Sequence, residues 1–180
     1  GNDQYNKNPY WDLYKNSNTT DKDVFRFTGK AIWNIDNHLK LQGTIGTDIN
    51  SMNFEDFIAK TTPGTPAGKL TDQIFNNRTL NAEILALYNN SWGDFDVNAT
   101  AGGNIFKVNN KTTTNVGLNQ QMNGIQNIMN YQEQNTRESI YKKQISSLYA
   151  SASLGYKHTY YLEGTLRGDR SSTLPTNNNT

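Results

Sequence analysis

The sequence of 180 residues contains no cysteine. That absence excludes a disulfide scaffold, a thiol nucleophile and a cysteine-ligated zinc site. Long hydrophobic runs are missing too, because the longest apolar stretch is about "ILAL" at residues 84–87. A membrane-spanning helix needs roughly 18 consecutive apolar residues. If this chain meets a membrane, it therefore does not cross it with helices.

Charge is also scarce: charged residues make up 18% of the chain, and the net charge is +1. No basic run is longer than Lys142–Lys143, so nucleic acid is not an expected partner. Hydrophobic residues reach only 34%, yet aromatic residues reach 11%, which is not the composition of a disordered chain. Many aromatic rings among amides and hydroxyls favour a β-protein with one apolar and one wet face.

Apolar and polar residues alternate with a period of two in "VFRFTGKAIWNI" and again in "LKLQGTIGTDI". This period predicts two strands, and the short link "DNH" between them predicts a hairpin. The same unit recurs at residues 80–106, around the link "NNSWGD", and at residues 146–169, around the link "KHT". The sequence thus predicts six antiparallel strands in three long hairpins.

Polar stretches separate the hairpins. Residues 51–77 and 107–138 are predicted to be loops, as are residues 1–22 and the tail from Ser171. Short and long connections would then alternate, as the short periplasmic turns and long external loops of an outer-membrane barrel do. The predicted fold class is all-β, with six antiparallel strands forming part of a transmembrane β-barrel.

The side chains support this interpretation, because the two sets of alternate residues along each strand differ in character. We call each set, which shares one face of the strand, a parity. Aromatic rings gather beside the short links, as in a membrane-interface girdle: Trp33, Tyr88, Trp92, Phe95, Tyr156 and Tyr160. The predicted outward faces carry no charge, whereas the opposite parity holds nine charged residues: Arg26, Lys30, Lys40, Asp48, Glu83, Asp96, Glu163, Arg167 and Asp169. An Arg or Lys near the midplane of the lipid face costs about 2–4 kcal/mol, which explains the segregation.

Two other interpretations stay open on the pattern alone. A soluble β-sandwich, secreted or exposed at the cell surface for adhesion, would also have an apolar and a polar face. A passive porin would have the same strand pattern as a plugged barrel. The predicted strands are near or above the roughly 9–11 residues that a tilted spanning strand needs, which favours the membrane.

Several segments together resemble one family. "NPYWDLY" at 8–14, "WGDFDVNATAGGN" at 92–104, "SLYASASLGYKHTYYLEGTLRGDRSSTLP" at 147–175 and the Asn-rich tail are similar to the barrel of SusC/RagA-type TonB-linked outer-membrane proteins. Arg170 departs from the bulky aromatic that the family tends to have before "SST". The resemblance covers a middle section of that barrel, so residues 1–180 are expected to be a barrel fragment without the plug, the N-terminal extension or the TonB-contacting segment.

The resemblance implies a multi-pass β-barrel in the cell outer membrane that imports glycans or peptides. Its expected partners are a SusD-like surface lipoprotein, TonB through a region absent here, and outer-membrane lipid. It implies no enzymatic chemistry, so no catalytic residue and no cofactor is expected.

The tripeptide Arg167-Gly168-Asp169 has the letters of an adhesion ligand. Counting parity from Tyr160 puts Arg167 and Asp169 together on the inward face at a strand end, whereas an adhesion ligand needs a mobile loop tip. Interaction with neighbouring strands or a plug is the main expectation for the pair, and contact with cargo along the lumen is the second.

Tyr10 and Trp11 precede the first strand, on the side of the long connections, where exposed rings can stack on sugars or grip peptide side chains. The alternative is that Pro9 fixes a turn there and the rings pack that turn onto its neighbours. His38 and His158 fall in separate short turns, so no metal site is expected from them.

Overall fold

A computed structural model describes residues 9–173. The elements follow in the order α1 (Pro9–Lys15), β1 (Ser17–Asn34), β2 (Leu39–Ile58), β3 (Lys69–Trp92), β4 (Phe95–Gln120), a short 3-10 turn η1 (Ile128–Asn130), β5 (Tyr131–Tyr156) and β6 (Tyr160–Ser171). The fold is all-β, with six strands in one sheet, consistent with a segment of a β-barrel. Within residues 9–173 no helix has the length and apolar character needed to span a membrane.

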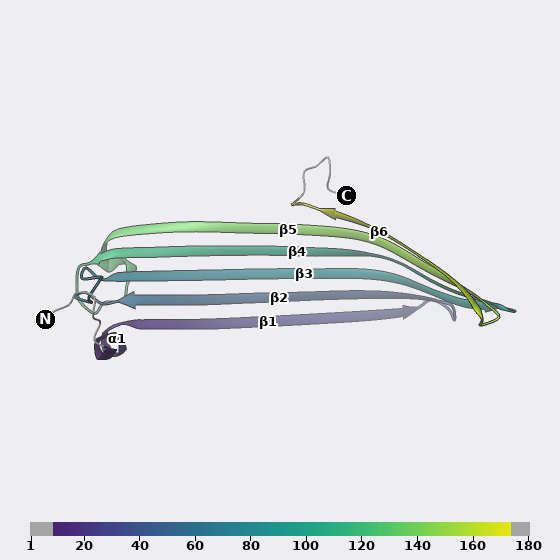
Figure 1. The fold of residues 1–180 in the computed structure, drawn as a ribbon, viewed down its shortest axis with the longest axis horizontal. Helices are drawn as coiled ribbons and strands as arrows, with labels where there is room; N and C mark the ends of the chain where they lie inside the picture. The colour runs from purple at the N-terminus through teal and green to yellow at the C-terminus, as the bar shows by residue number, and fades with distance from the viewer. Residues whose placement is uncertain (1–8, 174–180) are drawn as a thin grey trace. The chain divides into compact units, whose positions relative to one another are not determined.

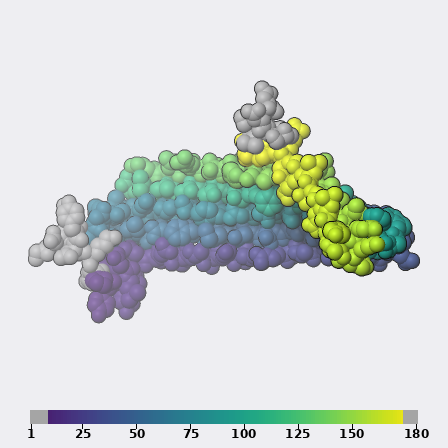
Figure 2. All heavy atoms as spheres, turned by 45° about the vertical axis from the view of Figure 1, so that its right-hand side comes forward, coloured from purple at the N-terminus to yellow at the C-terminus, as the bar shows by residue number. Residues whose placement is uncertain are grey.

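The strands lie in the sheet in chain order, β1-β2-β3-β4-β5-β6 (Figure 1). The colour bands of Figure 2 follow the same order. The antiparallel pairing of β5 and β6 places Tyr149 opposite Arg167 and Ser147 opposite Asp169. The predicted six-stranded antiparallel arrangement is therefore confirmed.

Three connections are short: residues 35–38, 93–94 and 157–159. In the first, Oδ1 of Asp36 accepts hydrogen bonds from the backbone N–H of His38 at 2.7 Å and of Leu39 at 2.8 Å, and these bonds lower the pKa of the Asp36 carboxyl. In the third, Lys157 and His158 have φ angles of 52° and 53°, the left-handed backbone that tight hairpin turns require. The predicted short links are confirmed, except that β3 continues through residues 89–92.

The two long polar stretches are mostly strand, so the prediction of loops at 51–77 and 107–138 is wrong. Only residues 59–68 and 121–130 connect the strands there. The reason is that Thr, Asn and Ser run on both faces of these segments, so no apolar face reveals the period of two, while the backbone ladder still forms. Of residues 1–22, positions 9–15 form α1 and β1 begins at Ser17. The part of the tail after Thr173 lies outside the described residues.

The chain divides into two compact units, each described by itself. Unit 1 holds residues up to Val24, Asn50–Asn77 and Asn110–Tyr141. Unit 2 holds Phe25–Ile49, Arg78–Asn109 and the residues from Lys142. Unit 1 contains α1 and both longer connections, and unit 2 contains the three short turns.

The buried core of unit 1 is small. Phe57, Ala59, Leu70 and Tyr131 are buried, and Ile128 packs against them. The ring of Tyr131 covers Gly117 so closely that a Cβ there would lie 2.6 Å from the Cγ atom of the ring. This cluster joins the ends of β2, β3 and β5 to the 3-10 turn, and it fixes the two longer connections in place.

The apolar parity of unit 2 is exposed. Leu148 on β5 and Leu166 on β6 are 75% and 78% exposed, and the same holds in lesser degree for Phe27, Ile45 and Ile84. Residues 9–173 form no second sheet over this face, although a sandwich would need one. Exposed apolar faces of this extent indicate contact with lipid or with another protein.

Aromatic rings lie beside the short turns of unit 2, as predicted. The ring centroids of Phe95 and Tyr156 are 4.8 Å apart, and those of Tyr88 and Trp92 are 6.4 Å apart. The backbone N–H of Lys157 also donates to the carbonyl of Asp94 at 2.7 Å, which ties two of the turns together. These rings thus lie at the strand ends that meet the short turns.

Candidate functional site

A polar network crosses β3, β5 and β6 on the charged parity of unit 2. The Tyr149 hydroxyl donates a hydrogen bond to a carboxylate oxygen of Glu83. The guanidinium of Arg167 lies 5.7 Å from the centroid of the Tyr149 ring, within cation–π range. The network therefore links an acid, a phenol and a cation from three strands, and we call it the polar-face network.

Gly102 on β4 makes room for this network. A Cβ at Gly102 would lie 2.6 Å from a side-chain carbon of Leu85, 2.7 Å from the backbone oxygen of Ile84 and 3.2 Å from the Tyr149 ring. Any larger residue would force the strands or the ring to move. Glycine at this position allows Tyr149 to reach past β4 to Glu83.

The Arg-Gly-Asp tripeptide lies within strand β6 and is paired with β5. Arg167 Nε donates to the Asp169 carboxylate at 2.9 Å, and its Nη2 donates to Ser147 Oγ at 3.4 Å. The predicted placement of Arg167 and Asp169 on one face of a strand is confirmed. The two charged side chains pair with each other, and their backbone belongs to a paired strand and not to the tip of a loop.

Other polar pairs occupy the same parity of unit 2. Arg26 on β1 and Asp48 on β2 form an ion pair at 2.6 Å. Asn104 on β4 donates to the side-chain oxygen of Asn81 on β3 at 2.7 Å. This face is therefore lined by hydrogen-bonding groups from all six strands, and it presents donors and acceptors to whatever lies against it.

Unit 1 contains a second candidate, a groove of about 570 Å³ that we call the loop groove. Its wall comes from α1, the end of β2, the start of the connection 59–68 and the connection 121–130: Trp11, Tyr14, Lys15, Phe57, Ala59, Asn123, Gly124 and Gln126. Three aromatic side chains, one cation and two amides make such a groove suitable for a sugar or a peptide.

Trp11 is anchored within this groove. Its indole Nε1 donates to Thr62 Oγ1 at 2.9 Å, and Asn16 Oδ1 accepts from the backbone N–H of Ala59 at 2.9 Å. The first bond fastens α1 to the connection 59–68, and the second fastens the residue that follows α1 to the same connection. The sequence analysis offered a fixed turn at Pro9 as the alternative to exposed rings. The structure has the helix α1 there instead, because proline suits the first helical position.

Tyr10 behaves differently from Trp11. It is 71% exposed and is not among the residues that line the loop groove. Although Tyr10 and Trp11 are adjacent in α1, only Trp11 lines the loop groove. Tyr10 and Trp11 belong to unit 1, whereas Arg167 and Asp169 belong to unit 2, so the four residues do not form one site.

Amide side chains close the two longer connections, and the sequence analysis missed them. Asn130 receives a bond from the backbone N–H of Met122 at 2.9 Å and donates to the carbonyls of Met122 at 2.7 Å and Ile125 at 3.0 Å. Gln120 accepts from the backbone N–H of Lys60 at 3.1 Å. The abundance of Asn and Gln hid these roles, since no composition signal separates a structural amide from a solvated one.

The Tyr131 hydroxyl is buried and has no hydrogen-bond partner among residues 9–173, and the residue is only 1% exposed. Burial raises the pKa of Tyr131 to about 12, and the carboxylate of Glu55 adds to the shift. The group therefore stays neutral across the physiological range and acts as part of the core.

Neither histidine lies in a cluster of metal-binding side chains. His38 Nδ1 is 3.1 Å from the carbonyl of Asn89, and His158 Nδ1 is 2.8 Å from Asp96 Oδ2. Within residues 9–173, no group of three or more His, Cys, Asp or Glu side chains converges on one point.

Comparison with known proteins shows likeness at the level of structure. No protein-family description matches the chain, and no curated protein matches it. The "Structure of the RagAB peptide transporter" superposes with a TM-score of 0.86 at 16% identity over 95% of this chain. The RagAB peptide importer in its "closed-closed" and "open-open" states gives TM-scores of 0.84 and 0.85, at 15% and 16% identity, over 91% and 95% of this chain.

The chain spans about a fifth of the length of those transporter chains, at 20%, 19% and 19%. At such low identity the likeness establishes the fold and leaves the activity open. The fold of this chain is therefore that of a section of the RagAB transporter structures.

Proposed function

We propose that this chain is a section of the barrel of a TonB-dependent transporter of the cell outer membrane. The observation that carries the proposal is the segregation of side chains in unit 2, with exposed Leu, Ile and Phe on one parity and paired charges on the other. A barrel strand between lipid and a polar lumen requires this segregation. The superposition on RagAB chains also supports the proposal, because it shows that the folds are similar.

In this proposal the strand segments of unit 2 cross the membrane, and the short turns lie on the periplasmic side. The apolar parity faces lipid, and the polar-face network faces the lumen, where a plug or cargo contacts it. The longer connections 59–68 and 121–130 are then the external loops. Arg167 and Asp169 line the lumen.

The cargo class in this proposal is a peptide or a glycan, taken up with a SusD-like surface lipoprotein. The loop groove supports the cargo assignment, because Trp11 and Tyr14 offer rings beside Asn123 and Gln126. TonB acts through a region outside this chain. An adhesive role is less well supported, because Arg167 and Asp169 pair with each other within a strand.

The test is uptake by cells that make the full-length protein carrying this chain. Fluorescent peptides of about ten residues and fluorescent oligosaccharides are supplied separately, with and without a protonophore. The proposal predicts energy-dependent accumulation of one class. Uptake that ignores the protonophore identifies a passive pore, and no uptake of either class, with the protein present at the surface, contradicts the proposal.

A further inference from the structure

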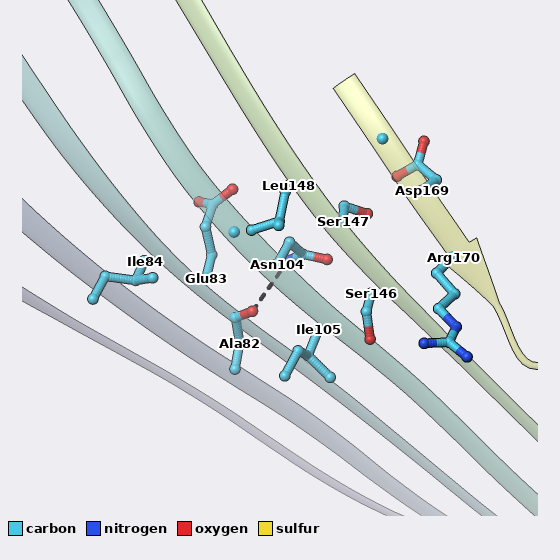
Figure 3. Close-up of a pocket in the computed structure, with 12 residues that line it drawn as sticks. Ala82, Glu83, Ile84, Asn104, Ile105, Ser146, Ser147, Leu148, Asp169 and Arg170 are labelled. Atoms are coloured by element: carbon cyan, nitrogen blue, oxygen red, sulfur yellow. Dashed lines mark hydrogen bonds between the residues drawn. The ribbon is translucent and has the colours of Figure 1, made fainter. Parts of the chain in front are cut away.

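The apolar parity of unit 2 contains a groove of about 700 Å³ across β3 to β6 (Figure 3). Its apolar wall consists of Ala82, Ile84, Gly103, Ile105, Leu148 and Gly168. Gly103 allows Leu148 to pack closely against β4, since a Cβ atom at position 103 would lie 3.1 Å from a Leu148 methyl carbon. Small residues on three strands thus hollow a face that is otherwise built of large aliphatic side chains.

One end of this groove is polar and cationic. Arg170 lines it from β6, and Ser146, directly opposite on β5, lines it as well. Gln144 Nε2 donates to Ser146 Oγ at 3.4 Å, which adds an amide to the same end. Arg170 directly follows Asp169 in β6, so the two side chains have opposite parity, and Asp169 is paired with Arg167. Figure 3 labels both residues at this end of the groove.

Further cations follow the apolar stretch on the same parity. Arg78 stands two residues before Leu80 on β3, Lys107 stands two residues after Ile105 on β4, and Lys142 has the parity of Leu148 on β5. Within residues 9–173, none of Arg78, Lys107, Lys142 and Arg170 forms an ion pair. The nearby carboxylates of Glu83 and Asp169 have the opposite parity, and Tyr149 and Arg167 engage them.

The position of Arg170 along β6 fits a membrane boundary. From the girdle residue Tyr160 to Arg170 the strand advances about 33 Å at roughly 3.3 Å per residue. A strand tilted by about 40° covers about 25 Å of height in that length, which equals the apolar band of outer-membrane barrels. Arg170 would therefore stand at the headgroup level opposite the turns.

We propose that this groove binds a phosphorylated acyl lipid of the outer leaflet, with an acyl chain along the apolar wall and its phosphate on Arg170 and Lys107. The proposal rests on the transporter function proposed above. Guanidinium and ammonium groups pair well with phosphate, and an unpaired cation beside an apolar groove matches a molecule with one anionic and one apolar end. The site distinguishes lipids by headgroup charge.

The experiment uses the full-length protein purified in neutral detergent, with native mass spectrometry as the readout. The probes are diphosphoryl lipid A and the same lipid after removal of both phosphates. The wild-type protein is expected to retain the diphosphoryl form at least tenfold better. Arg170→Gln combined with Lys107→Gln is expected to reduce that preference to about twofold or less, whereas Arg170→Lys keeps it.

A matched control removes two cations from the opposite parity, Lys30→Gln with Lys40→Gln, and keeps the preference. Heat-modifiable migration in gels verifies that each variant is folded. Equal retention of the two lipids by a folded wild-type barrel overturns the inference alone, as does an unchanged preference in the Arg170 and Lys107 variant. Failure of the protein to insert in membranes would instead overturn the proposed function.

Discussion

The Tyr149 hydroxyl on β5 donates a hydrogen bond to the Glu83 carboxylate on β3, across the intervening strand β4. The two residues can meet because Gly102 has no side chain. This contact ties together three strands on the polar face. It also positions the ring over which the Arg167 guanidinium lies.

Replacing Gly102 by alanine is expected to destabilise the sheet by about 1–3 kcal/mol, because the new methyl group collides with a backbone oxygen and the side chain of Leu85. The measurement is the urea midpoint of the full-length protein in detergent or lipid. Gly43→Ala is the matched control, since nothing lies within 4 Å of a Cβ there. Equal midpoints for the two variants would show that the close packing at Gly102 is not required.

Tyr131→Phe is expected to leave stability at neutral pH unchanged or raise it by about 1 kcal/mol, because it removes a buried hydroxyl without a hydrogen-bond partner in the part of the chain that the structure describes. The pKa of Tyr131 is raised to about 12 in the folded protein, against about 10 for an exposed tyrosine. The folded state therefore disfavours the phenolate. The contribution of this pKa shift to the free energy of unfolding is therefore complete below about pH 10, and it is lost as the pH rises towards about 12.

The pH test compares unfolding of the wild type and Tyr131→Phe between pH 9 and about 12. Other tyrosines titrate equally in both proteins, so the difference isolates Tyr131. The wild type should lose more stability with rising pH than the variant. Parallel curves would mean that the hydroxyl is accessible to water.

Asn130→Ala is expected to release the connection 121–130. The substitution deletes the side chain that bonds to Met122 and Ile125, and it leaves two backbone carbonyls without that partner. A local loss of about 2 kcal/mol is expected, which corresponds to roughly thirtyfold faster hydrogen exchange in residues 121–130. Asn135→Ala, an exposed position on β5, is the control. Similar exchange in both variants would contradict the role of Asn130.

Trp11→Ala is expected to weaken cargo binding about tenfold, because the ring is part of the loop groove wall and is held there by Thr62. Trp11→Phe should retain more of the affinity, since a ring remains. Tyr10→Ala is the control, because Tyr10 lies outside the groove wall. Binding is measured by fluorescence anisotropy with the transported peptide or glycan. A larger loss for Tyr10→Ala than for Trp11→Ala would place the contact surface elsewhere.

The strands of unit 2 were predictable because their two faces differ in polarity. Phe25, Phe27 and Trp33 alternate with Arg26, Thr28 and Asn34, and β1 follows that alternation. The face assignment of Arg167 and Asp169 followed from the same count. Even a single register slip would have reversed it.

The strands of unit 1 were not predictable by the same rule. In "NNKTTTNVGLNQ" the residues on both faces are mostly polar, so hydrophobicity shows no period, although Thr112, Thr114 and Val116 are β-branched and favour strands. The helix α1 was missed because seven residues give too little periodicity. The loop groove was missed because Asn123 and Gln126 reach Trp11 only through the tertiary fold.

The central claim is that one parity of the unit 2 strands faces lipid and the other faces a polar lumen. Single cysteines at Ile45, Thr44, Ala152 and Ser153 of the full-length protein test it in intact outer membranes. A water-soluble thiol reagent and a lipid-restricted quencher of an attached label are applied separately. The account predicts that labels at Ile45 and Ala152 are quenched from lipid, whereas Thr44 and Ser153 react from water or are shielded by a plug. Equal access of the water-soluble reagent to all four positions, with no lipid quenching, would contradict it.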